Sequence, residues 1–235
     1  YWKPREGLNF GDELNSWLWP LVFPELRLLP ATARFLGIGT ILNDRAPVGD
    51  PTIVFGSGQG YGAPPTLDER WDVRCVRGPL SAERLGLPVA KAVTDGGALI
   101  SVVDKPAPSG SSAWGFVPHR HNSNAGWRTV IESLNGLYID PERTAPEVMA
   151  DVLSCERIVT EAMHGAIFAD TLRIPWHAVS IANTADVFKW TDWCRSMTLE
   201  PAFSSLRRVY TASAPSGLPA MRATLRSGIA RWSLR

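Results

Sequence analysis

The sequence has few cysteines and no long apolar run, the two features that most directly identify disulfide-rich, zinc-binding and membrane proteins. Cysteine occurs three times, as Cys75, Cys155 and Cys194, without the paired spacing of a zinc site or a disulfide framework. Because unpaired cysteines suit a reducing compartment, the sequence predicts a cytoplasmic protein. No apolar run approaches the length of a membrane-spanning helix, so an integral membrane protein is not expected.

An excess of charge of one sign is also lacking. The 24 lysines and arginines are balanced by 23 aspartates and glutamates, which leaves a formal net charge of +1. Nucleic acid is therefore not an expected partner, since the chain as a whole does not attract phosphate backbones. The 235 residues, of which 45% are hydrophobic, are enough for one large or two small globular domains.

The stretch Asp151–Ser180 carries the clearest pattern. Arg157–Glu161 is short, β-branched and apolar, which is typical of a buried strand. His164–Leu172 has apolar residues at helical spacing, and Trp176–Ile181 again indicates a strand. A strand, a helix and a second strand in this order predict a βαβ unit with parallel strands.

Three polar or small residues of this unit fall where ligands bind in such folds. Glu161, His164 and Gly165 directly follow the first strand, at the carboxyl edge of the predicted sheet. The start of a helix offers N–H groups and a partial positive charge there, so His164 is well placed to meet an anion. On the local pattern alone, a histidine that hydrogen-bonds its own loop is an equally good interpretation.

A second polar group ends the stretch Trp114–His121. A short strand stops at Pro118 and is followed by His119, Arg120 and His121. Three cationic or titratable side chains in a row are unusual in a chain with only four histidines. They indicate a functional loop, with a solvated loop as the alternative.

The first half of the chain contains a glycine-rich loop. The strand Pro51–Phe55 leads into Gly56–Gly60, where Gly58 would let the backbone approach a ligand closely. The loop lacks the spacing of a P-loop or of a dinucleotide fingerprint, so it does not identify a ligand by itself.

Arg77 follows the next predicted strand, Trp71–Val76. It can pair with a carboxylate or phosphate at the strand end, or it can be a structural arginine that closes the domain. Val93–Leu99 predicts one more strand and a turn, in which we expect Asp95 to be structural rather than catalytic.

Near the start of the chain, Asn9–Trp19 predicts a loop that leads into a helix. Asp12 is placed to cap the N–H groups that follow it. Asn9 and Asp12 can also face a cleft, because a glycine between them gives the loop freedom to turn.

Near the other end, Phe188–Leu199 predicts a helix that begins at Thr191 or Asp192. Lys189 and Trp190 precede that start. They either pack between domains or line a cleft that faces a substrate.

The segment Lys105–Ser112, where proline, glycine and serine cluster, divides the chain. We therefore expect four segments of an α/β protein: a Rossmann-like domain over 1–104, a linker over 105–113, a second Rossmann-like domain over 114–200, and a basic tail over 201–235. The end of the tail, Met221–Arg235, either lies on an anionic membrane surface or packs back on the first domain.

Several short motifs occur in the order in which one enzyme family has them. These are N-F-G-D-E-L-N, G-S-G, V-R-G-P-L-S, T-E-A-M-H-G and K-W-T-D-W, spread from Asn9 to Trp193. Together they resemble the polysaccharide pyruvyl transferase family, and among its members the bacterial exopolysaccharide enzymes of the succinoglycan type. The resemblance implies two Rossmann-like domains that face a cleft, the GT-B-like arrangement.

The resemblance also implies a reaction. A pyruvyl group passes from phosphoenolpyruvate to two hydroxyls of a sugar and forms a cyclic ketal, without a metal or an organic cofactor. The expected acceptor is a lipid-linked oligosaccharide, which would bring the enzyme to the inner face of the cell membrane as a peripheral protein.

The resemblance assigns roles to residues of this sequence. Arg120 is the expected anion clamp, His164 contacts phosphate or acts as the acid, and Asp12 orients or deprotonates the acceptor hydroxyl. The expected substrate-binding residues are Asn9, Gly58, Arg77, His119, His121, Glu161, Gly165, Lys189 and Trp190.

Two other functions fit the same pattern. One is a GT-B glycosyltransferase that uses a nucleotide sugar, and the other is a non-catalytic protein that binds sugar. The fold alone does not separate them from a pyruvyl transferase, because one scaffold serves many functions.

Overall fold

A computed structural model describes residues 8–28, 33–45, 50–181 and 186–205. The chain divides into two compact units. The first unit consists of Tyr1–Lys105, Glu142–Pro146 and Asp186–Pro201, and the second of Pro106–Pro141, Glu147–Ala185 and Ala202–Arg235.

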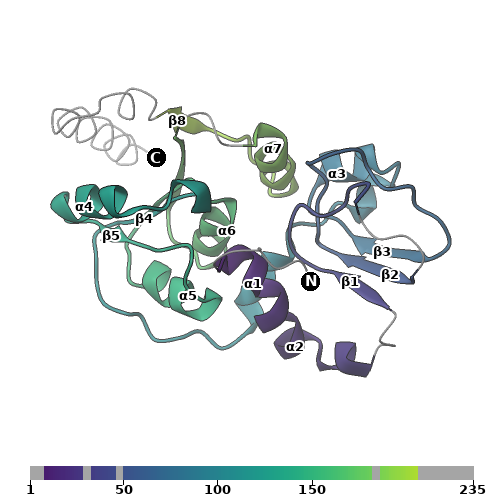
Figure 1. The fold of residues 1–235 in the computed structure, drawn as a ribbon, viewed down its shortest axis with the longest axis horizontal. Helices are drawn as coiled ribbons and strands as arrows, with labels where there is room; N and C mark the ends of the chain where they lie inside the picture. The colour runs from purple at the N-terminus through teal and green to yellow at the C-terminus, as the bar shows by residue number, and fades with distance from the viewer. Residues whose placement is uncertain (1–7, 29–32, 46–49, 182–185, 206–235) are drawn as a thin grey trace. The chain divides into compact units, whose positions relative to one another are not determined.

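The first unit contains a sheet of three parallel strands in the order β1-β2-β3 (Figure 1). The strands are β1 Arg34–Leu36, β2 Thr52–Phe55 and β3 Trp71–Cys75. Its α-helices are α1 Phe10–Trp17, α2 Trp19–Val22, α3 Pro79–Arg84 and α7 Val187–Ser196, and its 3-10 helices are η1 Pro24–Leu28, η2 Val89–Lys91 and η3 Gly96–Val102.

Aromatic side chains join the helices of the first unit to its sheet. The buried ring of Trp19 meets Phe35 of β1 edge-on at 4.9 Å between centroids, and Phe55 of β2 at 5.6 Å. Edge-to-face rings at these distances are favourable beyond the area they bury. The same indole N–H donates to Asn15 of α1, so the polar atom of this core residue is satisfied.

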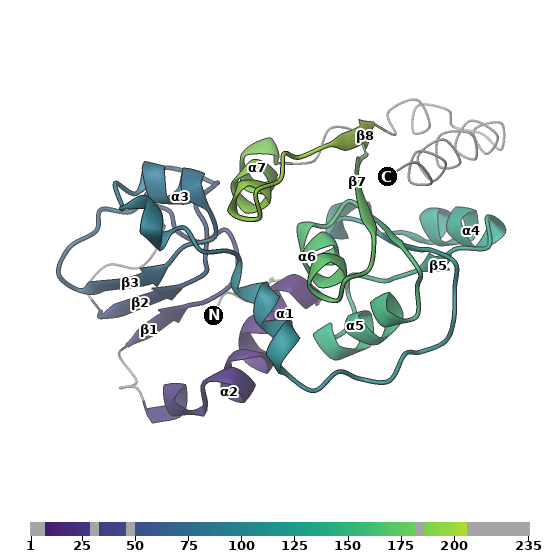
Figure 2. The same ribbon diagram turned by 180° about the vertical axis from the view of Figure 1, so that it is seen from behind.

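The second unit contains a sheet of five parallel strands in the order β5-β4-β6-β7-β8. The strands are β4 Gly115–Val117, β5 Leu137–Tyr138, β6 Ile158–Thr160, β7 Trp176–Ser180 and β8 Phe203–Ser205. The helices are η4 Arg120–Asn122, α4 Ala125–Ser133 and α6 Met163–Thr171, while α5 Ala145–Leu153 begins in the first unit and continues in the second. Helix α4 packs beside β5, and α6 packs beside β6 and β7 (Figure 2).

This strand order creates a switch point in the second sheet. The chain passes from β4 outward to β5 and then returns to the other side of β4 as β6. In open parallel sheets, ligands bind where the strand order reverses, outside the carboxyl ends of the strands. The segments that follow β4 and β6 are therefore the ones that the fold places for binding.

The α/β class and the parallel strands are confirmed. The predicted βαβ unit forms as β6, α6 and β7, with Ile158 paired to Trp176 in parallel register. Strands predicted as continuous apolar runs are those that the structure buries, as β4 and β6 show along their whole length.

One predicted strand is wrong. Val93–Leu99 contains no strand, and its second half begins η3. The Asp95 side chain accepts a hydrogen bond from Gly97 N at 2.8 Å and caps η3, so this turn chemistry prevails over the apolar pattern.

Two predicted helix starts are also wrong. Helix α1 is capped by Asn9, whose side chain accepts from Gly11 N, while Asp12 lies inside the first turn. Helix α7 begins earlier than predicted and is capped by Asp186, which leaves Thr191 in its second turn. A helix is capped by the side chain of the residue with extended backbone just before its first turn. The sequence patterns did not indicate that Asn9 and Asp186 are these residues.

The contacts of two segments differ from the expected division. Helix α7 groups with the first unit, although its sequence position suggested the second. The linker is held against α5, since Ser109 N donates to Ala150 O and Ser112 N donates to Ser154 O. That the linker separates two independently folding domains stays a prediction.

The predicted basic tail contributes β8, which pairs in parallel with β7 at the edge of the second sheet. The remainder of the tail, including Met221–Arg235, lies outside the described residues. Among the residues that are described, none of the helices has the length and apolar character that crossing a membrane requires.

Candidate functional site

The carboxyl edge of β4 and β6 brings together most of the histidines of the chain. His119 and His121 follow β4, and His164 follows β6, while Val117 and Thr160 pair at the ends of these strands. The fourth histidine, His177, lies near the start of β7, where its Nε2 is 2.8 Å from Ser204 Oγ. The sheet register therefore places two of the predicted segments at one edge.

The Glu161 side chain connects the segments at this edge through hydrogen bonds. It is buried and accepts hydrogen bonds from His119 N at 3.0 Å, from Asn122 Nδ2 at 2.8 and 2.9 Å, and from Ile181 N at 2.9 Å. It thus ties the loop after β4 to the end of β7. This geometry gives Glu161 a positioning role, whereas the contact with substrate that the sequence suggested stays a prediction.

The loop after β4 is shaped by its own first residue. His119 caps η4, and its Nδ1 accepts from His121 N at 3.4 Å. The two imidazole rings lie 5.1 Å apart between centroids. Arg120 is half-buried and His121 is exposed, so the loop presents cationic and titratable groups at the edge of the sheet.

Helix α6 starts close to the two strands because of a glycine. A Cβ added to Gly165 would lie 2.5 Å from Thr160 Oγ1 and 3.1 Å from Val117 Cβ. A side chain here would push the helix away from β4 and β6, so the close packing explains the glycine. Half-buried His164 occupies the first turn of this helix.

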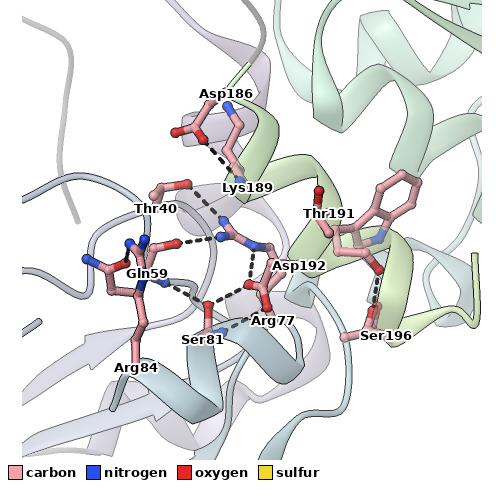
Figure 3. Close-up of polar contacts among 12 residues, drawn as sticks. Thr40, Gln59, Arg77, Ser81, Arg84, Asp186, Lys189, Thr191, Asp192 and Ser196 are labelled. Atoms are coloured by element: carbon pink, nitrogen blue, oxygen red, sulfur yellow. Dashed lines mark hydrogen bonds and ion pairs between the residues drawn. The ribbon is translucent and has the colours of Figure 1, made fainter. Parts of the chain in front are cut away.

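The first unit contains a second polar cluster, which surrounds a fully buried arginine (Figure 3). Arg77 Nε donates to Asp192 Oδ2 at 3.0 Å, Nη1 to Thr40 Oγ1 at 2.8 Å, and Nη2 to Gln59 O at 2.7 Å. The guanidinium thereby joins α7 to the loops after β1 and β2. Of the two interpretations of Arg77, this geometry supports the structural one.

Asp192 completes the cluster on the α7 side. Its carboxylate accepts from both the backbone N and the hydroxyl of Ser81, in the first turn of α3. Two glycines make room for the pair: a Cβ on Gly58 would lie 2.2 Å from Arg77 Cζ, and one on Gly78 would lie 2.0 Å from Asp192 O. Packing against Arg77 therefore accounts for Gly58, and its contact with substrate stays a prediction.

The predicted residues of α1 and α7 have different environments. Asn9 Nδ2 donates to Asp12 Oδ2 at 2.9 Å, so these two predicted residues lie together. Trp190 is 1% exposed and packs edge-on against Trp193, which makes it a core residue. Lys189 is half-buried in the first turn of α7.

Charged residues of the first unit shift the pKa of Lys189. Burial is the largest cause that lowers the pKa of the Lys189 ammonium, followed by the charge of Arg77. Three carboxylates act in the opposite direction, those of Asp186, Asp12 and Asp95. The Lys189 side chain is therefore within electrostatic reach of α1, η3 and the cap of α7.

The sequence predicts Asp192 only as a helix cap, and it does not single out Thr40, Ser81, Asp186 or Tyr61. The motif K-W-T-D-W contains Asp192, but its partner Arg77 lies 115 positions away, so no local signal joins them. Tyr61 directly follows the glycine-rich loop, and that position was the available signal. Among the described residues, no group of three or more metal-binding side chains could hold a metal ion.

The fold and these edges define a class of protein. It is an α/β protein with parallel sheets, in which the segments at a strand-order switch point carry histidines and an arginine. A sequence model of the polysaccharide pyruvyl transferase family matches residues 9–183, and the chain belongs to that family.

The chain is similar to the succinoglycan biosynthesis protein ExoV of Rhizobium meliloti (strain 1021). That protein is 38% identical to this chain over 204 residues, which cover 84% of the chain. The match spans 64% of the length of that relative.

The buried pair of the first unit yields a prediction about stability. Asp192→Ala would leave the Arg77 charge buried without its carboxylate. We expect the free energy of unfolding to fall by about 3–5 kcal/mol, as for other broken buried pairs. Urea unfolding followed by tryptophan fluorescence measures this loss.

Asp72→Ala is the matched control. It removes the partner of Arg74 in an ion pair of 2.7 Å whose side chains are 47% and 64% exposed. Such surface pairs contribute about 1 kcal/mol or less. Equal losses in the two variants would contradict the structural role of the Arg77–Asp192 pair.

Proposed function

We propose that this protein transfers a pyruvyl group from phosphoenolpyruvate to two hydroxyls of a sugar in an exopolysaccharide repeat unit, as a ketal. The observation that carries the proposal is the edge after β4 and β6, where Arg120 and three histidines follow strands that pair in parallel. Family membership supports the reaction class, and the similarity to a succinoglycan biosynthesis protein supports the biosynthetic context.

The chemistry needs an acid and an anion clamp. A proton added to the methylene carbon of phosphoenolpyruvate makes C2 electrophilic, and one sugar hydroxyl attacks that carbon. The second hydroxyl then displaces phosphate, which leaves with the electron pair of the C–O bond. Of the two hydroxyl protons, one balances the proton given to the methylene group and the other leaves with phosphate.

The residues of the second unit suit these roles. Arg120 offers a permanent charge and a planar fork of donors for phosphate or carboxylate. His164, in the first turn of α6, is the proposed acid, because imidazole exchanges protons near neutral pH. In the first unit, Asp12 is the proposed group that orients or deprotonates the acceptor hydroxyl. The scheme requires no cofactor.

The proposed acceptor is a lipid-linked oligosaccharide, which would place the protein at the inner face of the membrane. The GT-B-like arrangement, with domains that face a cleft, stays a prediction. A nucleotide-sugar glycosyltransferase and a non-catalytic sugar-binding protein are the alternatives that an assay must separate.

The first experiment tests the reaction itself. The chain is incubated with phosphoenolpyruvate and a short oligosaccharide, and we expect release of phosphate together with an acceptor heavier by one pyruvate less one water. Mass spectrometry and a phosphate assay measure both. A mass gain of one hexose from a nucleotide sugar would favour the glycosyltransferase, and no product from either donor would favour the binding protein.

Arg120→Lys tests the clamp. The charge remains but the fork is lost, so we expect the KM for phosphoenolpyruvate to rise about tenfold or more, the effect of one lost charged hydrogen bond. Arg128→Lys in α4 is the control, since Arg128 is 46% exposed and pairs with Asp140. Similar kinetics in both variants would remove Arg120 from the donor site.

His164→Ala tests the acid. If His164 donates the proton, kcat falls by about a hundredfold or more, with a smaller change in the KM for phosphoenolpyruvate. His177→Ala is the matched control, because that histidine lies near the amino end of β7. Near-native turnover of a folded His164→Ala protein would show that the acid is another group.

A further inference from the structure

We propose that the hydroxyl of Ser180, at the end of β7, donates a hydrogen bond to the phosphate of the donor at the start of α6. The inference rests on the proposed function and deepens it, because it names a residue of the donor site that no sequence motif singled out. Such a contact makes Ser180 a determinant of specificity for a phosphate-bearing donor.

The register of the second sheet brings Ser180 level with the residue that precedes α6. Thr160 of β6 pairs with Ala178 of β7 in parallel. Ala162 still has an extended backbone, so this register continues by two residues and sets Ser180 beside Ala162. The end of β7 therefore lies next to the start of α6, two elements that pack side by side in Figure 2.

The Ser180 side chain points to the face of the sheet opposite α4. Side chains alternate between the two faces of a strand. Val179 and Ile181, on either side of Ser180, belong to a core cluster that includes Trp127 of α4, so Ser180 faces the other way. Ile181 N also donates to Glu161 Oε1 at 2.9 Å. This contact fixes the end of β7 against the segment between β6 and α6.

A second hydroxyl on the same face is bonded within the protein. Thr160 shares the face of Ser180, because its strand partner Ala178 lies two residues before Ser180. A Cβ added to Gly165 would be 2.5 Å from Thr160 Oγ1, so this face lies directly against α6. The Thr160 hydroxyl accepts from Ala162 N at 3.1 Å and donates to Ala162 O at 2.8 Å. Its bonds therefore go to the chain itself.

The Ser180 hydroxyl differs from that of Thr160. The residue is only 8% exposed, and no atom of the described residues makes a hydrogen bond with its Oγ. A buried hydroxyl without a hydrogen bond is costly, and each such group in a native protein calls for an explanation. A ligand at the start of α6 explains this one, because it would accept the bond that the described part of the protein does not.

The start of α6 indicates the class of ligand. The helix Met163–Thr171 is preceded by Ala162, which has no side-chain oxygen to cap the first N–H groups. Uncapped N–H groups and the helix dipole favour an anion, and phosphate is a common ligand of such termini. A phosphate has three acceptor oxygens, which can bind the hydroxyl and the N–H groups at the same time.

Ser180→Ala tests the contact, because it removes the hydroxyl and little else. We expect the dissociation constant of inorganic phosphate to rise about tenfold, the effect of one lost hydrogen bond to a charged group, while that of pyruvate stays within about twofold. Phosphorus NMR follows phosphate, and saturation-transfer NMR follows the methyl group of pyruvate. Ser133→Ala is the matched control, since Ser133 is exposed and its hydroxyl donates to Val130 O within α4.

A stability measurement separates ligand contact from a packing role. Because the Ser180 hydroxyl has no described partner, Ser180→Ala should leave the urea midpoint of the phosphate-free protein unchanged or raise it. Thr160→Val removes a bonded hydroxyl and should lower the midpoint. Weaker phosphate binding without a loss of stability supports the contact. Native phosphate binding by Ser180→Ala, weaker binding of pyruvate alone, or a lowered midpoint would overturn it.

A second variant covers the case in which Ser180→Ala does not fold. Ser180→Cys keeps a side chain of similar shape, and its thiol is a weak donor. We expect this variant to fold and to bind phosphate more weakly than the native chain. Native phosphate binding by a folded Ser180→Cys protein would also overturn the contact.

The phosphate titrations also separate this inference from the proposed function, because they need no turnover. Phosphate binding that Ser180→Ala weakens supports the contact even if no sugar accepts a pyruvyl group. Pyruvyl transfer by Ser180→Ala with an unchanged KM for phosphoenolpyruvate refutes the contact and leaves the reaction standing.

Discussion

The ion pair between Arg77 and Asp192 is the constraint on which the first unit depends. Both side chains are fully buried, so each would be costly without the other. Hydrogen bonds to Thr40 and Gln59 on one side, and from Ser81 on the other, satisfy the remaining polar atoms. The pair thereby sets the place of α7, of α3 and of two loops at once.

A different constraint governs the second unit. There, the strand order places the segments after β4 and β6 next to each other, and buried Glu161 fastens them with hydrogen bonds. The two units therefore differ in chemistry. The edge of the second sheet presents Arg120 and histidines, whereas the first unit buries its Arg77 against Asp192.

Local patterns predicted the elements well where burial decided them. The unit of β6, α6 and β7 follows from apolar periodicity, because strand and helix periods differ enough to be told apart in a short stretch. Prediction failed where side-chain chemistry decided the backbone, as at Asp95, which starts a 3-10 helix in place of a strand. The sequence predicts contact with ligands for Gly58 and Gly165, but the structure explains these glycines by close packing against Arg77 and Thr160.

The sequence by itself determined the α/β class, the parallel strands and the family, because these depend on patterns within short stretches. It also identified Arg120, His164 and Lys189 as candidates, since each follows or opens a recognisable element. Only the tertiary structure decided which distant segments lie together. Asp192 meets Arg77 across 115 positions, and α7 belongs with the first unit although it follows the second in sequence. Such contacts depend on how distant segments pack, and no local pattern records that packing.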